Sequence, residues 1–124
     1  MRYMISAFIL ALLCSLAAFA RPDNDPILGK WTNASGNRVI EFVKNGDGFD
    51  AIIRKAEDSS LIGKKQISGL HKKNSTTYSD GTLYLVNQGK TAACSVVMSS
   101  PDLIQLTGKM GLFAKSQQWK RLKS

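Results

Sequence analysis

Few side chains in this sequence are suited to acid–base or nucleophilic chemistry. His71 is the sole histidine and stands in the basic, turn-like stretch "GLHKKN", so no Ser-His-Asp or Cys-His set can be assembled around it. Cys94 lies in an alternating apolar segment, which favours a buried and inert thiol, because a reactive thiol needs electropositive and partly open surroundings. We therefore expect the protein not to be an enzyme.

Carboxylates occur in two short groups. Asp23 and Asp25 form one, and Asp47 and Asp50 form the other. Neither spacing matches a calcium-binding loop, and turn chemistry accounts for both groups. The sequence predicts no metal site and no cofactor.

Glu41 has two interpretations. It could face the interior of the fold together with Val39 and Val43, where a buried carboxylate beside an arginine would be a candidate site. The alternative is an exposed position on the polar face of an amphipathic strand. The alternation of residues by itself leaves both open.

The segments that contain the candidate residues named above have the pattern of short strands separated by turn sequences. "NRVIEFVK" and "FDAIIRKA" alternate between apolar and polar positions on either side of "NGDG", which predicts a hairpin. No window shows helical periodicity, and 57–65 is the longest polar interval, which we expect to be a loop. Turn signals stand at 45–48, 79–81, 87–90, 99–102 and Gly111. This spacing is typical of an all-β sandwich or barrel.

Both faces of the segment "TAACSVVMSS" are fairly apolar, with Cys94 and Val96 on the same face. A small closed barrel explains this pattern and removes unpaired strand edges. We therefore expect an antiparallel up-and-down barrel of about eight strands, present as a monomer. If the interior holds a ligand, the residues expected to contact it are Glu41, Tyr84, Cys94 and Val96. Whether the interior is a cavity or a packed core stays open.

The first twenty residues have the pattern of a secretory signal peptide. Arg2 precedes an apolar run that ends in Ala18-Phe19-Ala20, the small-x-small pattern that signal peptidase recognises. The run is shorter than the about 20 residues that a membrane-spanning helix needs, so we expect no membrane span. Cleavage after residue 20 would start the mature chain at Arg21. Lipidation at Cys14 is the alternative, but Leu13 stands where a small residue is expected.

Removing 1–20 leaves 104 residues, which are expected to form a single domain over 21–124. The whole chain carries a net charge of +8, and the lysines are dispersed between turns and polar faces. Nucleic-acid binding needs cations clustered with stacking aromatics, so we do not expect it. Cys94 would be the only remaining thiol, which excludes an intrachain disulfide. We expect a periplasmic location.

Two tryptophan motifs stand near the ends of the mature chain: "GKW", with Gly29 and Trp31, and "WKR", with Trp119 and Arg121. Together they resemble the signature of calycin barrels, the lipocalins and fatty-acid-binding proteins. The resemblance implies that the first and last strands pair and that Arg121 lies across the Trp31 ring. A guanidinium over an indole contributes roughly 0.5 to 2 kcal/mol.

A closer resemblance covers nearly all of the mature chain. The order "GKW", "VIEF", "DGTLYLVNQGKTAACSV" and "LTGKMGLFAKSQQWKR" is similar to the bacterial secreted family called domain of unknown function 2147. Leu85-Val86 replaces its Asp-Pro, and Ala92 replaces its tyrosine. The resemblance implies a calycin-like barrel and an exported protein, with no established activity. Positions matching the family signature are Gly29, Trp31, Gly81, Tyr84, Gly89, Lys90, Thr91, Gly108, Gly111, Phe113, Gln117, Trp119 and Arg121.

Two functions remain as hypotheses. The first is binding of a small apolar ligand inside the barrel. The second is interaction with an envelope protein, as an inhibitor or assembly factor, through loops 57–65 and 71–80. An interior pocket of about 300 Å³ or more with apolar walls would favour the first. A filled interior with exposed apolar loop tips would favour the second.

Overall fold

The computed structural model describes residues 25–123. The expected signal peptide over 1–20, the cleavage that would expose Arg21, and Cys14 lie outside the described residues.

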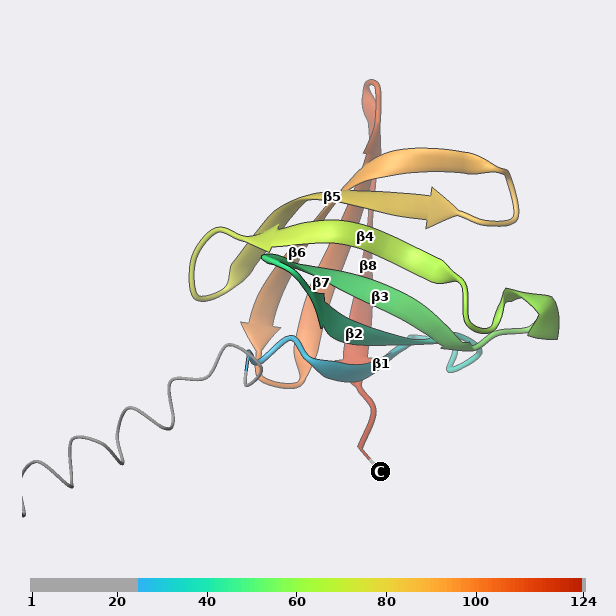
Figure 1. The fold of residues 1–124 in the computed structure, drawn as a ribbon, viewed down its shortest axis with the longest axis horizontal. Helices are drawn as coiled ribbons and strands as arrows, with labels where there is room; N and C mark the ends of the chain where they lie inside the picture. The colour runs from blue at the N-terminus through green and yellow to red at the C-terminus, as the bar shows by residue number, and fades with distance from the viewer. Residues whose placement is uncertain (1–24, 124) are drawn as a thin grey trace, which may run out of the picture.

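Eight antiparallel strands form one closed barrel in which each strand pairs with the next and β1 pairs with β8 (Figure 1). The chain order is therefore also the order around the barrel, which confirms the predicted all-β up-and-down fold. The strands are β1 (Gly29–Asn33), β2 (Val39–Asn45), β3 (Gly48–Lys55), β4 (Lys65–Lys72), β5 (Thr77–Leu85), β6 (Lys90–Ser100), β7 (Leu103–Met110) and β8 (Phe113–Arg121).

The hairpin expected at 45–48 joins β2 to β3, with Asn45 paired to Gly48. The prediction of a turn at 79–81 is wrong, because these residues lie inside β5. There Asp80 has a φ of 63°, and the pairing with β6 shifts between Tyr78 and Gly81. The residues that tolerate positive φ form a bulge rather than a turn.

The loop expected at 57–65 connects β3 to β4 and contains η2 (Ser59–Leu61), a single 3-10 turn. Asp58 caps this turn by accepting a hydrogen bond from the backbone N–H of Ser60 at 3.0 Å. Leu61 is buried and belongs to the hydrophobic core.

The connections gather at two ends of the barrel, because successive strands run in opposite directions. In Figure 1 the β4–β5 connection lies at the left and η2 at the right. We call the first end, which also carries residues 25–28, the closed end, and the second end the open end. The open end has the connections 34–38, 56–64, 86–89 and 111–112.

A packed hydrophobic core fills the barrel next to the closed end. The rings of Phe49 and Tyr78 meet edge to face, with centroids 5.6 Å apart. The core includes ten large side chains that are essentially inaccessible to solvent: Trp31, Tyr78, Phe42, Ile27, Ile40, Ile53, Ile67, Leu70, Ile104 and Val96. Burial of this apolar surface is the main stabilising contribution to the barrel.

The two tryptophan motifs meet at the closed end. The guanidinium carbon of Arg121 lies 4.3 Å from the centroid of the Trp31 ring, and Trp31 pairs with Arg121 in the β1–β8 ladder. The indole Nε1 of Trp31 donates to the carbonyl of Ile27 at 2.9 Å. Nη1 of Arg121 donates to the carbonyl of Leu28 at 3.0 Å. The contact between Arg121 and Trp31 that the resemblance implies is therefore present. It joins the first strand of the barrel to the last.

Candidate functional site

A cavity of about 700 Å³ opens at the open end of the barrel. Its volume lies within the range of about 300 to 1,000 Å³ that is usual for small-molecule pockets. The interior is thus a packed core at one end and a cavity at the other. Six large apolar side chains line the cavity: Leu83, Leu85, Leu106, Met110, Phe113 and Trp119.

Polar side chains from several strands and loops line the same cavity. The charged ones are Arg38, Lys115 and Glu57, two cations and one carboxylate, so the cavity wall carries a net positive charge of one. The neutral ones are Asn33, Gln66, Gln88 and Gln117. The cavity wall therefore combines apolar side chains with polar ones and a small excess of positive charge.

Arg38 and Gln66 form a hydrogen-bonded pair across the mouth. Nη1 of Arg38 donates to Oε1 of Gln66 at 2.6 Å, and Nε2 of Gln66 donates to the carbonyl of Tyr84, also at 2.6 Å. Arg38 directly precedes β2, Gln66 lies near the start of β4, and Tyr84 lies near the end of β5. All three positions are at the open end. Gln66 is 7% exposed, so its amide is held within the protein.

Two donors in the cavity wall have no partner within residues 25–123. They are Nε1 of Trp119 and Nε of Arg38, and both atoms are closed to solvent. Trp119 is 4% exposed. A buried donor without an acceptor is unfavourable by about 1 to 3 kcal/mol. Since solvent reaches neither atom, both donors lie behind other atoms of the wall and do not face the open volume of the cavity.

The tip of the β7–β8 hairpin projects from the body of the barrel (Figure 1). Leu112 is 101% exposed and Phe113 is 82% exposed. Met110 and Phe113 also contribute to the cavity wall. Exposed large apolar side chains thus stand at one side of the cavity mouth.

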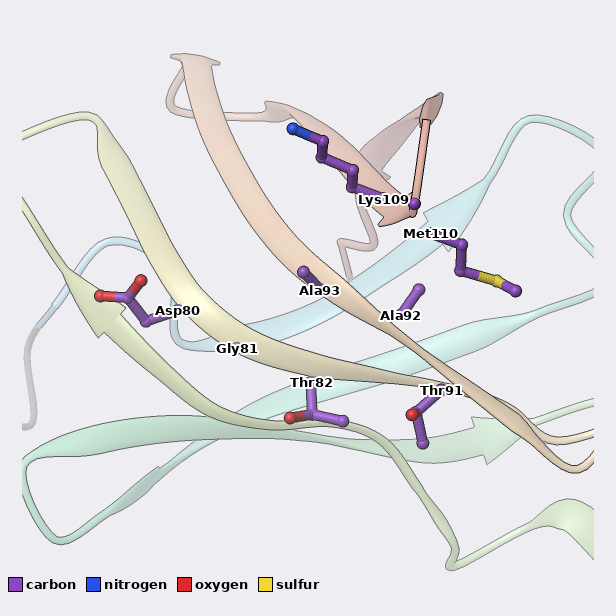
Figure 2. A pocket seen from close by; sticks show the side chains of 9 residues that line it. Asp80, Gly81, Thr82, Thr91, Ala92, Ala93, Lys109 and Met110 are labelled. Atoms are coloured by element: carbon purple, nitrogen blue, oxygen red, sulfur yellow. The ribbon is translucent and has the colours of Figure 1, made fainter. Parts of the chain in front are cut away.

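A second depression, of about 620 Å³, is open to solvent over β5, β6 and β7. Figure 2 shows Thr82, Ala93 and Lys109 along it. Asp80 also lines it but pairs with Lys73, whose Nζ lies 2.7 Å from Oδ2 of Asp80. This depression offers no enclosed volume, and the cavity at the open end is the better candidate site.

The structure does not place Glu41 in the barrel interior, so that expectation is corrected. Its carboxylate is 31% exposed, and its Oε1 accepts from Nε of Arg54 at 2.8 Å on the outside of the barrel. The neighbouring residues Ile40 and Phe42 are the buried ones. Successive residues of a strand point to opposite faces, so Glu41 points outward.

The other three residues expected to contact a ligand do not line the cavity. Tyr84 is half-buried, and its hydroxyl lies 3.0 Å from Oγ of Ser68. Cys94 and Val96 face the interior but belong to the packed core, with 3% and 0% exposure. Burial raises the pKa of the Cys94 thiol to about 12. His71, which the sequence placed in a turn-like stretch, lies in β4 and is exposed.

Several signature residues have positions at the cavity. Gly108, Gln117 and Trp119 line it, and Gly111 has a φ of 57° in the turn beside it. Arg38 and Gln66 were not predicted from the sequence as cavity residues. The signal for Arg38 was the period of two: it precedes the buried Ile40 by two positions and so shares its inner face.

Within residues 25–123, no three His, Cys, Asp or Glu side chains gather as a metal site would require. The same range contains no helix with the length and hydropathy to span a bilayer.

The comparisons agree with this architecture. The protein HP1028 from the human pathogen Helicobacter pylori, described as belonging to the lipocalin family, has a similar structure, with a TM-score of 0.64 at 21% identity over 78% of this chain and 83% of that one. A redesigned β-barrel is similar with a TM-score of 0.53 at 15% identity, over 84% of this chain and 98% of the other. These likenesses show the fold alone.

No curated protein matches the sequence. Residues 29–121 match the family described as "Uncharacterized protein conserved in bacteria" (DUF2147). That span runs from the first residue of β1 to the last residue of β8. The chain therefore belongs to the bacterial family DUF2147, built on a lipocalin-like barrel.

Proposed function

We propose that this protein binds a small, largely apolar ligand in the cavity at the open end of the barrel. The observation that carries the proposal is the cavity of about 700 Å³ lined by leucines, Met110, Phe113 and Trp119. Burial of an apolar ligand against these side chains would provide the driving force for binding. The interior next to the closed end is packed, so the binding volume is confined to the open end.

The test is a titration with a neutral apolar fluorescent probe, N-phenyl-1-naphthylamine. We expect its fluorescence to rise on binding to the unmodified protein. Leu85→Trp adds bulk within the cavity wall and should weaken binding about tenfold or more, equivalent to 1.4 kcal/mol or above. Val97→Trp is the matched control, because Val97 is 44% exposed and does not line the cavity. No fluorescence rise, or equal effects of the two substitutions, would contradict ligand binding in this cavity.

We propose a binding protein rather than an enzyme. The single histidine is exposed, and burial keeps Cys94 protonated at neutral pH. Native mass spectrometry of protein purified from the periplasm is the direct measurement. A ligand recovered unchanged supports binding, whereas a ligand converted to a product during incubation would show catalysis.

We further propose export to the periplasm, which is supported by the sequence pattern of residues 1–20. N-terminal sequencing of the protein from a fractionated cell should begin at Arg21. Retention of Met1, or a lipid on Cys14, would contradict this cleavage.

A second candidate function is interaction with an envelope protein. The observation that favours it is the exposure of Leu112 and Phe113 at the β7–β8 tip. This tip, rather than loop 57–65 or 71–80, has the most exposed apolar side chains. Loop 57–65 contributes Ile62 at 49% exposure.

Site-specific photocrosslinking in cells separates the two surfaces. A photoreactive residue at position 112 should give a discrete adduct if the tip contacts a partner, and one at position 62 serves as the control. Leu112→Ser with Phe113→Ser should abolish an adduct formed from position 110. An adduct from position 62 alone would place the partner at loop 57–65 instead.

A further inference from the structure

The cavity wall contains a cation without a counter-charge. Arg38 lines the cavity and forms no ion pair with any described carboxylate. Its side chain is neither fully exposed nor fully buried. Removing a charge from water is unfavourable unless an opposite charge or hydrogen bonds compensate. A ligand that brings a negative charge to Arg38 would therefore be favoured over a neutral one.

Gln66 holds the Arg38 guanidinium in place. Its Oε1 accepts from Nη1 of Arg38 at 2.6 Å, while its Nε2 is anchored on the Tyr84 carbonyl at 2.6 Å. Gln66 is itself 7% exposed. A side chain that is already oriented loses less conformational freedom when a ligand binds. Gln66 is thus a positioning residue for the cation.

Trp119 lines the same cavity, although it comes from the opposite end of the sequence. Its indole Nε1 and Nε of Arg38 are buried without a partner, but solvent reaches neither atom, so neither is offered to a ligand in the cavity. The half-buried cation of Arg38 is therefore the group of the wall that acceptor oxygens of a ligand would meet.

From these contacts we infer that the ligand is an apolar molecule bearing a single carboxylate, which accepts hydrogen bonds from the guanidinium of Arg38. This inference rests on the proposed ligand binding. The charged residues of the wall sum to one positive charge, from Arg38 and Lys115 against Glu57. That sum matches a monoanion, whereas a phosphate monoester would bring about −1.5 to −2 charges. The apolar body of the ligand would contact Leu83, Leu85 and Leu106.

The test compares decanoate with 1-decanol, which share an apolar chain and differ in charge. Each is measured by displacement of N-phenyl-1-naphthylamine at pH 7.5. The quantity of interest is the ratio of the decanoate affinity to the decanol affinity. Arg38→Gln should lower this ratio about tenfold or more, because a charge-assisted hydrogen bond is lost. Arg54→Gln is the matched control, since Arg54 pairs with Glu41 on the outside of the barrel, and should leave the ratio unchanged.

A further variant keeps the inference testable if Arg38→Gln fails to fold. Gln66→Glu places a carboxylate at the position where Oε1 already meets Arg38, so it should compete with decanoate and lower the ratio while decanol still binds. Added salt should weaken decanoate more than decanol.

The outcomes separate the two proposals. If the neutral probe and decanol bind but the ratio is the same in Gln66→Glu and Arg38→Gln as in the unmodified protein, the carboxylate inference is wrong and ligand binding stands. If neither the probe nor either decyl compound binds the unmodified protein, both proposals are wrong. A ratio that also falls in Arg54→Gln would show that general surface charge, not the cavity, attracts the anion.

Discussion

Asp25 joins the segment before β1 to the closed end of the barrel. Its Oδ2 lies 2.8 Å from Nζ of Lys72, its Oδ1 accepts from the backbone N–H of Ile27 at 3.0 Å, and the Tyr78 hydroxyl donates to the same Oδ1. Burial alone would raise the pKa of Asp25, but the hydrogen bonds from Lys72 and Tyr78 outweigh it and hold the pKa below its ordinary value of 3.8. The carboxylate is therefore favoured in the folded protein.

This network predicts how stability depends on pH. A group whose folded pKa is lowered contributes stability that is complete above its unfolded pKa and is lost as the pH falls through the folded pKa. The contribution of Asp25 should therefore begin to decline below about pH 4 and be lost as the pH falls through the lower pKa of the folded protein. Asp25→Asn should be less stable than the unmodified protein at pH 7, by roughly 1 to 3 kcal/mol, and the difference should shrink at pH 2. Urea unfolding at both pH values measures it, and a constant difference would contradict the role of the charge.

Cys94 shows how burial alone controls a side chain. It is 3% exposed in the hydrophobic core, opposite Gly81 and Gly108 in the neighbouring strands. Burial raises its pKa to about 12, so the thiolate that reacts with electrophiles is scarce at neutral pH. We expect a thiol reagent to label the native protein slowly and the protein in 6 M guanidinium within minutes. Equal rates in the two conditions would show that Cys94 is accessible.

At the scale of the element, glycines allow the strands to approach closely. A Cβ added at Gly48 in β3 would lie 2.9 Å from the backbone carbonyl oxygen of Leu70 in β4. A Cβ added at Gly108 in β7 would lie 2.8 Å from Cδ2 of Leu83, the far end of a flexible side chain. The two distances are similar, but the neighbours differ in their freedom to move.

This difference predicts unequal costs for the same substitution. Gly48→Ala should destabilise the protein by about 1 to 3 kcal/mol, because a backbone oxygen in a sheet can move only with its strand. Gly108→Ala should cost less than about 1 kcal/mol, because Leu83 can change its rotamer. Urea unfolding with matched m-values gives both free energies. Similar costs would indicate that the β3–β4 pair adjusts as easily as a leucine side chain.

At the scale of the whole molecule, closure depends on a contact between the first and last strands. Arg121 lies across Trp31 and also donates to the carbonyls of Leu28 and Pro101, at 3.0 and 3.1 Å. Gly29 leaves room for it, since a Cβ there would lie 3.1 Å from Nη1 of Arg121. Without this closure, β1 and β8 would each present an unpaired edge.

A double-mutant cycle tests the closure. Arg121→Ala should destabilise by roughly 1 to 3 kcal/mol, and Arg121→Lys should recover part of this because an ammonium lacks a planar surface. Trp31→Ala should cost about 3 to 5 kcal/mol. The coupling between the two sites should be at least about 0.5 kcal/mol. Lys120→Ala, at an exposed neighbouring position, is the control and should change stability by less than about 0.5 kcal/mol. Additive effects of Arg121→Ala and Trp31→Ala would show that the two residues act separately.

The barrel could be predicted from local patterns, because alternation and turn residues are properties of neighbouring positions. The hairpin at 45–48 and the buried face of β6, with Ala92, Cys94, Val96 and Met98, follow from period two. The prediction of a turn at 79–81 was wrong because it too used only a local pattern. Residues that tolerate positive φ form bulges as well as turns, and the sequence does not distinguish the two.

The site required the tertiary structure. Sequence alternation assigned Cys94 and Val96 to the interior, but only side-chain packing decides which part of that interior is filled. Arg38 directly before β2, Gln66 in β4 and Trp119 in β8 line the same cavity. These residues are far apart in the sequence and come together only when the barrel closes. Strand periodicity and turn spacing therefore predicted by themselves an all-β sandwich or barrel, and the Gly-x-Trp and Trp-x-Arg motifs, through their resemblance to calycin barrels, indicated that it closes between the first and last strands. The location and chemistry of the cavity were decided by contacts between distant segments, because no local pattern encodes volume that side chains leave empty.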